Sequence, residues 1–232
     1  MITLSINAQP TDTITTSNGN LIIHFIGHGS LFFEHNGMVI HVDPYSSLTD
    51  YSKLLKADFI LVTHQHGDHL DSAALASIYK WGTTIYWTKE CQKSNKLNFP
   101  SNVVGNGDKF VLNGINVDVV PAYNIVNKRQ NGTPFHSKGE GNGYIFTFGN
   151  LRVYVAGDTE NIPEMSSFGI VDIAFLPMNL PYTMTPEMVF EAVRMINPKI
   201  LYPYHFGKTD TAIIVELLKD NPQIEVRIRR ME

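Results

Sequence analysis

The sequence contains one cysteine, Cys91, among 232 residues, so no disulfide can form within the chain. The polar segment around Cys91 has no second thiol at a zinc-ligand spacing, and we expect no function for it. No apolar run approaches the roughly 20 residues that a membrane span needs. Positive charge is also scarce, because 18 Lys and Arg face 22 Asp and Glu and leave a net charge of −4. Nucleic acid is therefore not an expected partner.

The N-terminal segment MITLSINAQP has two readings. Its apolar stretch, residues 2–8, is shorter than the apolar region of a signal peptide, although Ala8 before Gln9 resembles a cleavage site. We predict that residues 1–20 form an N-terminal extension, as a signal-peptide remnant or a short strand, and that residues 21–232 form a single domain. As written, the chain is expected to be cytoplasmic, whereas a start further upstream would make it periplasmic or exported.

Short β-branched and aromatic runs separated by Gly, Asn or Asp predict many strands, and Asn36-Gly37 predicts a hairpin turn between two of them. Helices are predicted at 72–80, 185–195 and 209–219, with Asp71 and Thr185 as N-caps of the first two. Strands that come in groups, followed by helices, indicate an α+β fold of two sheets covered by helices. The predicted strands are 21–26, 31–35, 38–42, 59–63, 84–87, 109–112, 115–120, 143–148, 151–155, 171–176 and 200–203.

The segment THQHGDHLD, residues 63–71, concentrates His64, His66, Asp68 and His69 between a predicted strand and a predicted helix. Alternate residues such as His64 and His66 can point the same way, and Asp68 with His69 can reach a second point nearby. Imidazole together with carboxylate suits zinc, manganese or iron. The segment therefore predicts a metal site at the edge of a sheet.

This segment resembles the H-x-H-x-D-H signature of the metallo-β-lactamase superfamily. FIGHGS (25–30) and HVDPY (41–45) resemble motifs of the branch that includes ascorbate-6-phosphate lactonase and N-acylphosphatidylethanolamine phospholipase D. YVAGDT (154–159) and YPYHFG (202–207) resemble later motifs of the superfamily, in the same order along nearly the whole chain. The resemblance implies a four-layer αββα sandwich of two mixed sheets and a metal-dependent hydrolase.

The resemblance also implies a binuclear metal site, with two zinc ions expected and manganese or iron as alternatives. The first ion would be held by His64 and His66, and the second by Asp68, His69 and His205. Asp158 would bridge both ions. Asp158 and His205 each follow an apolar predicted strand, where an unpaired buried polar group would be costly.

The sequence departs from the superfamily pattern at one ligand. A third histidine of the first ion is expected where this chain has Asn124, and an amide oxygen is a weaker zinc ligand than imidazole. Either the first site is weak, or His136 in the long irregular stretch 124–142 completes it. A substrate contact by His136 and a single-metal enzyme are further alternatives.

Three other positions are candidates for contacts with a substrate. His28 lies in a Gly-His-Gly turn and could contact the substrate or donate a proton during catalysis. Tyr182 precedes a predicted helix and could line the pocket. Arg129 and Lys138 in the long stretch could meet a phosphate or simply be solvated.

These residues predict hydrolysis of a small-molecule ester, phosphorylated lactone or phosphodiester by a metal-bound hydroxide, with Asp68 orienting that hydroxide. No Ser-His-Asp arrangement is apparent in the sequence. A metal-binding or sensing protein of the same fold, with little or no catalysis, is the alternative that Asn124 keeps open. The sequence leaves the oligomeric state open.

Overall fold

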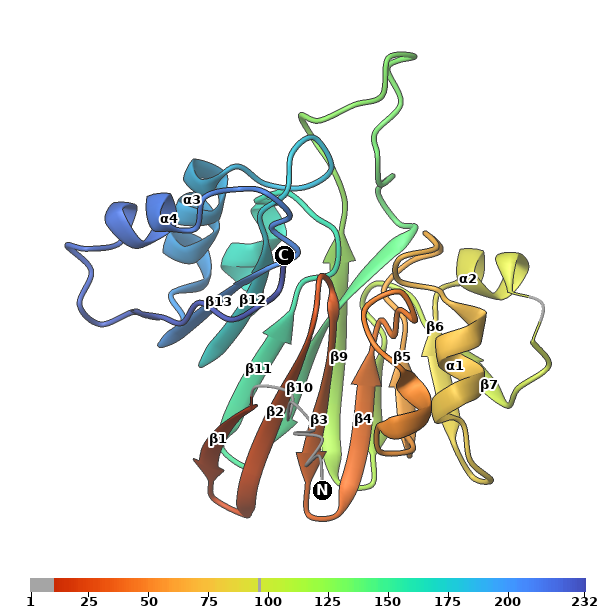
Figure 1. The fold of residues 1–232 in the computed structure, drawn as a ribbon. Coiled ribbons are helices and arrows are strands. Elements are labelled where there is room, and N and C mark those ends of the chain that lie inside the picture. The colour runs from red at the N-terminus through yellow and green to blue at the C-terminus, as the bar shows by residue number, and fades with distance from the viewer. Residues whose placement is uncertain (1–10, 96) are drawn as a thin grey trace, which may run out of the picture.

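Two mixed seven-stranded sheets pack against each other in the computed structural model, which describes residues 11–95 and 97–232 (Figure 1). The first sheet has the order β1-β2-β3-β4-β5-β6-β7, antiparallel from β1 to β4 and parallel from β4 to β7. Its strands are β1 (Thr11–Thr16), β2 (Gly19–Gly27), β3 (Ser30–His35), β4 (Met38–Val42), β5 (Phe59–Leu61), β6 (Thr84–Trp87) and β7 (Ser101–Val103).

The second sheet has the order β14-β13-β12-β11-β10-β9-β8. Strands β8 to β11 pair antiparallel, and strands β11 to β14 pair parallel. Its strands are β8 (Lys109–Leu112), β9 (Ile115–Ala122), β10 (Gly141–Phe148), β11 (Leu151–Val155), β12 (Ile173–Pro177), β13 (Ile200–Tyr204) and β14 (Glu225–Val226).

The helices lie outside the two sheets (Figure 1). Helices α1 (Ser72–Ile78) and α2 (Lys89–Ser94) lie beside β5 to β7, and a cluster that includes Leu75, Cys91 and Trp87 joins them to the first sheet. Helices α3 (Pro186–Ile196) and α4 (Ala212–Leu217) lie beside β12 and β13. Two short 3-10 helices, η1 (Tyr51–Lys53) and η2 (Pro163–Ser167), complete the described elements. This arrangement confirms the predicted αββα sandwich.

The local signals read from the sequence act as expected. The Asp71 carboxylate accepts hydrogen bonds from the first backbone N–H groups of α1, and Thr185 accepts one from Met188 in α3. Asn36 and Gly37 both adopt positive φ, as a two-residue hairpin turn requires. Two predicted helices extended too far, since α1 ends at Ile78 and α4 covers only Ala212–Leu217.

The sequence predicted a short strand as one form of the N-terminal extension, where β1 lies, but it did not predict β7, β14, α2, η1 or η2. β1 falls within the predicted N-terminal extension and pairs along its whole length with β2. Residues 1–10, where a signal-peptide remnant was considered, lie outside the described residues. No helix of the described residues is long and apolar enough to cross a membrane.

Asp12 lies on β1, the edge strand of the first sheet, and contacts residues near β14, the edge strand of the second sheet. It therefore links the two sheets at this edge. Its carboxylate accepts a hydrogen bond from the Tyr202 hydroxyl on β13 and hydrogen bonds from Arg229 Nη2 at 2.7 and 2.8 Å. Burial raises the Asp12 pKa, but the hydrogen bonds from Tyr202 and Arg229 outweigh burial and hold it below 3.8. The ionised carboxylate therefore stabilises the fold.

Replacing Asp12 with Ala should lower the free energy of unfolding by about 1–3 kcal/mol at neutral pH, measured by urea denaturation. A carboxylate with a lowered pKa contributes stability above its ordinary pKa and loses it as the pH falls. The difference from wild type should therefore shrink in acid. Asp220→Ala, at an exposed position, is the control and should change stability by less than about 0.5 kcal/mol. Equal effects of both substitutions would contradict this account of Asp12.

Cys91 is fully buried in α2, where the Thr88 hydroxyl lies 3.3 Å from its sulfur. Burial raises the pKa of the thiol to about 11, so the reactive thiolate is scarce near neutral pH. We predict that a chromogenic thiol reagent leaves the native protein unmodified while it labels the urea-unfolded chain completely. Labelling of the native protein at the rate of a free thiol would show that Cys91 is accessible.

Candidate metal centre

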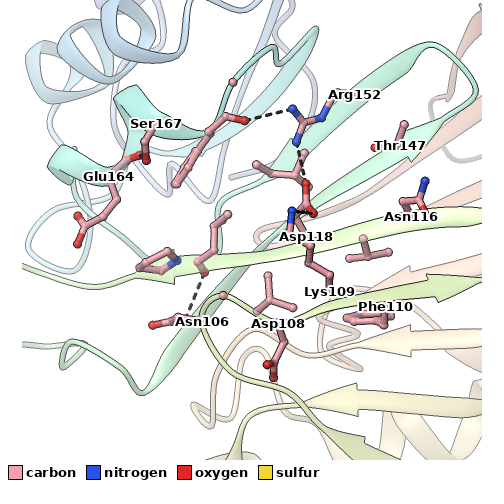
Figure 2. A pocket seen from close by; sticks show the side chains of 18 of the residues that line it. Asn106, Asp108, Lys109, Phe110, Asn116, Asp118, Thr147, Arg152, Glu164 and Ser167 are labelled. Atoms are coloured by element: carbon pink, nitrogen blue, oxygen red, sulfur yellow. Dashed lines mark hydrogen bonds and ion pairs between the residues drawn. The ribbon is translucent and has the colours of Figure 1, made fainter.

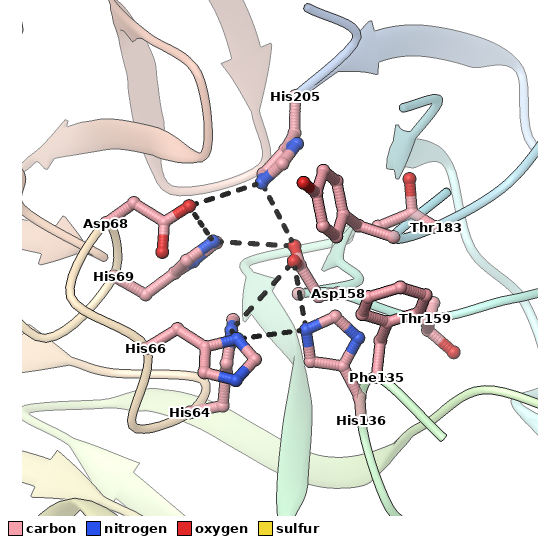
Figure 3. Close-up of polar contacts among 12 residues, drawn as sticks. His64, His66, Asp68, His69, Phe135, His136, Asp158, Thr159, Thr183 and His205 are labelled. Atoms are coloured by element: carbon pink, nitrogen blue, oxygen red, sulfur yellow. Dashed lines mark hydrogen bonds and ion pairs between the residues drawn. The ribbon is translucent and has the colours of Figure 1, made fainter. Parts of the chain in front are cut away.

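Loops at one edge of the two sheets carry the polar residues singled out above. Parallel pairing of β4 with β5, and of β11 with β12 and β13, places the ends of these strands at the same edge. The segment that begins at His64 follows β5, Asp158 follows β11, and His205 follows β13. Figure 3 shows their side chains pointing toward one another from both sheets.

The first group consists of His64, His66 and His136, each offering one ring nitrogen within 4.8 Å of the others. His66 Nδ1 lies 3.1 Å from His64 Nε2 and 3.2 Å from His136 Nε2. His136 reaches this group from the long loop between β9 and β10. His136 therefore lies where the superfamily pattern expects a third histidine beside His64 and His66.

Asn124 lies behind His136 and makes contacts through its whole amide. Its Oδ1 accepts hydrogen bonds from His136 N at 2.9 Å and from His136 Nδ1 at 2.7 Å. Its Nδ2 donates to Glu160 Oε1 at 3.1 Å and to the Tyr182 carbonyl at 2.9 Å. Because Nδ1 is engaged by Asn124, the Nε2 atom of His136 is the nitrogen that faces the group.

The second group consists of His28, Asp68, His69 and His205. Asp68 Oδ2 lies 3.1 Å from His28 Nε2 and 4.0 Å from the Nε2 atoms of both His69 and His205. The His28 and His205 rings are in contact, with centroids 3.6 Å apart. His28 and His205 both have positive φ, a conformation that non-glycine residues adopt rarely and that is enriched in Asn, Asp and His.

Asp158 lies between the two groups and is 5% exposed. Its Oδ2 is 3.2 Å from His136 Nε2 and 3.9 Å from His64 Nε2. Its Oδ1 is 3.5 Å from the Nε2 atoms of both His69 and His205. One carboxylate thus faces both groups, one oxygen to each.

A second layer of contacts fixes the orientation of these rings. The Asp43 carboxylate lies 2.8 Å from His69 Nδ1 and accepts hydrogen bonds from the backbone N and hydroxyl of Thr63, both at 2.7 Å. Asp43 was not among the residues predicted to form the site, although HVDPY places it directly after a strand. Gly29 also matters, because a Cβ at this position would lie 2.8 Å from His69 Cε1.

The fit of a metal ion can be tested on the buried polar atoms. His69 Nε2, His205 Nε2 and Asp158 Oδ1 are buried, and none has a hydrogen-bond partner among the described residues. Such atoms are costly to bury unless something binds them. They belong to the groups above, so the donor set fits divalent ions that prefer nitrogen and carboxylate ligands.

Three of four groups already have the protonation state that binds metal. Burial lowers the pKa of His205 to about 4 and holds that of His64 well below its usual value. Burial would raise the Asp158 pKa, but His205 and His69 outweigh burial and hold it well below 3.8. For His69, burial is outweighed by Asp158 and Asp43, which raise its pKa to about 9. Neutral imidazoles and an ionised carboxylate are the forms that bind metal, and an ion would replace the proton on His69 Nε2.

A cavity of about 390 Å³ opens onto the two groups. Tyr182 and Arg129, both candidates for substrate contact, line this cavity. Lys138 is not among the lining residues; its ammonium donates to Glu164 at 2.7 Å. The cavity is lined by His28, His66, Asp68, Arg129, Phe135, His136, Asp158, Asn179, Tyr182 and His205.

A larger cavity of about 990 Å³ lies over β8 to β11, against η2 (Figure 2). Three of its charged side chains pair with one another, since Asp118 binds Arg152 at 2.9 Å and Lys109 at 3.0 Å. The groups that could hold a metal ion all lie elsewhere among the described residues. The smaller cavity is therefore the candidate reactive site, because candidate metal ligands line it.

Comparison with known proteins agrees with this geometry. The family model of the β-lactamase superfamily domain matches residues 22–205. A UPF0173 metal-dependent hydrolase of Enterococcus faecalis is 30% identical over 215 residues, covering 88% of this chain and 92% of the relative. Another, from Thermus thermophilus, is 30% identical over 199 residues, covering 80% and 83%.

Solved structures give the same result. A candidate metal-dependent hydrolase of Parabacteroides distasonis is 45% identical, with a TM-score of 0.90 over 97% of this chain and 100% of that one. A metallo hydrolase of Ignicoccus hospitalis shares the fold, with a TM-score of 0.73 at 24% identity over 91% of this chain and 95% of that one. The chain therefore belongs to the metallo-β-lactamase superfamily and is one of its metal-dependent hydrolases.

Proposed function

We propose that the chain binds two divalent metal ions and uses them to hydrolyse a small ester, phosphorylated lactone or phosphodiester. The observation that supports this most strongly is the position of Asp158, with one oxygen toward each group of ring nitrogens. In this assignment, His64, His66 and His136 would hold one ion, Asp68, His69 and His205 would hold the other, and Asp158 would serve both. Zinc suits this ligand set best, with manganese and iron(II) as alternatives.

Bound divalent ions would lower the pKa of a water molecule toward neutrality and polarise the carbonyl or phosphoryl oxygen under attack. The chain supplies positioning and proton transfer. The Asp68 side chain is 38% exposed, whereas that of Asp158 is 4% exposed, so Asp68 is the carboxylate that can accept a hydrogen bond from the attacking water. His28, 3.1 Å from Asp68, can then donate a proton to the leaving group.

The alternative of a metal-binding protein without catalysis rested on Asn124 at the expected place of a histidine. With His136 beside His64 and His66, that argument no longer favours it. The cavity of about 390 Å³ lies at the small end of small-molecule sites, which supports a small substrate.

Metal content tests the ligand assignment. Elemental analysis of protein purified without chelator should give about two ions per chain in the wild type and about one in His136→Ala. Asn124→Ala should keep all three histidines of the first ion, but lose the hydrogen bonds that orient the His136 ring. We expect metal affinity to fall about 10-fold to 100-fold in that variant, measured by competition with a chelator.

His24→Ala is the matched control, because His24 pairs with Glu34 on β2 and β3 and lies outside both groups. It should keep the full metal content. Two ions retained in His136→Ala would exclude His136 as a ligand and restore the weak-site alternative.

Turnover tests the hydrolase itself. Asp158→Asn keeps the shape of the side chain but removes the charge facing both groups. It should lower kcat/KM for ester and phosphodiester substrates by about 100-fold or more while the circular dichroism spectrum stays unchanged. Absence of turnover by the metal-loaded wild type on every ester, lactone and phosphodiester screened would favour the binding protein instead.

A further inference from the structure

One part of the cavity wall contains no candidate metal ligand. It is formed by Arg129, Phe135, Asn179 and Tyr182. Arg129 is the one Lys or Arg among the lining residues of this cavity. These four side chains are the ones that a substrate would meet beyond its reacting bond.

Arg129 is available to bind an anion. Its Nη2 donates to the Phe135 carbonyl at 3.4 Å, and its guanidinium carbon lies 5.0 Å from the centre of the Phe135 ring. Within residues 11–95 and 97–232 it makes no ion pair with a carboxylate. A guanidinium has five N–H donors in a planar fork that matches a carboxylate or phosphate, and four of them remain unused.

The loop that carries Arg129 is held in place at its base. The Glu160 carboxylate accepts hydrogen bonds from the backbone N–H groups of Ile125, Val126 and Asn127, each at 2.7 Å. Nearer the tip, Arg129 N donates to the Thr133 carbonyl at 2.7 Å and Gly132 N donates to the Arg129 carbonyl at 2.9 Å. Arg129 is therefore carried on a hydrogen-bonded turn, which reduces the ordering cost of binding.

The neighbours of Arg129 complete a site for a small polar molecule. Phe135 and Tyr182 contact each other edge to face, with ring centroids 5.1 Å apart, and offer apolar surface. The Asn179 backbone is engaged by Tyr182 and Thr183, whereas its side-chain amide makes no hydrogen bond within the described part of the chain. That amide can donate to a ligand oxygen or accept from a ligand hydroxyl.

Charge favours an anion at this wall. The carboxylates that line the cavity are Asp68 and Asp158. Two divalent ions carry +4, which balances Asp68, Asp158, Asp43 behind His69 and one bound hydroxide. Arg129 adds a positive charge to this balanced centre, so the loaded cavity attracts anions although the chain as a whole carries −4.

We propose that the substrate carries an anionic group, a carboxylate or a phosphate, in addition to its scissile bond, and that Arg129 binds this group. The proposal rests on the hydrolase function above and narrows its substrate class to small anionic esters, lactones or phosphodiesters. Arg129 thereby acts as a specificity-determining residue, and Asn179 and Phe135 lie beside the group that it binds.

Binding of simple ligands tests the proposal without turnover. The metal-loaded wild type would be titrated calorimetrically with butyrate, succinate and 3-phosphonopropionate, which share one carboxylate and a similar length. Succinate, 3-phosphonopropionate or both should bind about tenfold tighter than butyrate, because a second anion meets Arg129. The second anion that gives the larger gain distinguishes a carboxylate from a phosphate as the natural group.

Arg129→Met should remove this preference, and Arg129→Lys should keep part of it, because the charge remains while the planar fork is lost. Lys128→Met is the matched control: it removes the same charge from the adjacent exposed position, which does not line the cavity. It should leave the preference intact. Metal content and thermal unfolding would be measured for every variant.

The anion site is overturned if the wild type shows no preference or binds none of the three ligands, if Arg129→Met keeps the preference, or if Lys128→Met loses it equally. Turnover of neutral 4-nitrophenyl butyrate and of the anionic mono-4-nitrophenyl ester of succinate by the loaded wild type reports on the hydrolase function separately. A preference that depends on Arg129 without turnover of either ester, or of any lactone or phosphodiester screened, would retain the anion site and reject the hydrolase.

Discussion

The buried carboxylate of Asp158 is the constraint on which the rest of the site depends. A negative charge with 5% exposure is costly unless opposite charge or hydrogen bonds surround it. The chain supplies ring nitrogens from His64 and His136 near one oxygen and from His69 and His205 near the other. These rings come from both sheets, so the two halves of the sandwich must be aligned for the charge to be compensated. The geometry of the site therefore depends on how the two sheets pack against each other.

The rings are oriented by protein contacts that need no ion. Asp43 fixes the His69 ring through Nδ1, and Asn124 does the same for His136, which leaves the Nε2 atoms facing Asp158. Asp43 is itself held by the backbone and hydroxyl of Thr63. Such outer contacts set the tautomer and the basicity of a ligand. The orientation of these rings is therefore largely set by the protein itself.

The sequence was most informative where a signal was local. The apolar strands, the Asn36-Gly37 hairpin and the cap at Asp71 follow from short-range rules. The dense His64–His69 segment predicted a metal site in the same way. Helix α2 was missed because its polar sequence KECQKS shows little periodicity, and β14 because two residues carry no pattern. Asn124 and His136 could not be ranked from sequence, because their roles depend on a loop that returns 12 residues later. Glu160 was missed for the same reason: its partners are backbone groups of that loop.

The loop between residues 124 and 136 orients the His136 ring at its base and carries Arg129 and Phe135 beyond it. At the base of the loop, Asn124 N donates to the His136 carbonyl and the Asn124 side chain binds His136. Contacts between the two ends of the loop therefore fix the His136 ring. Arg129 and Phe135 lie between these two ends, in a part of the loop that can change in length or composition while Asn124 and His136 stay in place. Loops tolerate such change far better than sheets do. A chain built in this way can keep its proposed metal ligands constant while the loop between residues 124 and 136, which carries the proposed substrate contacts, varies.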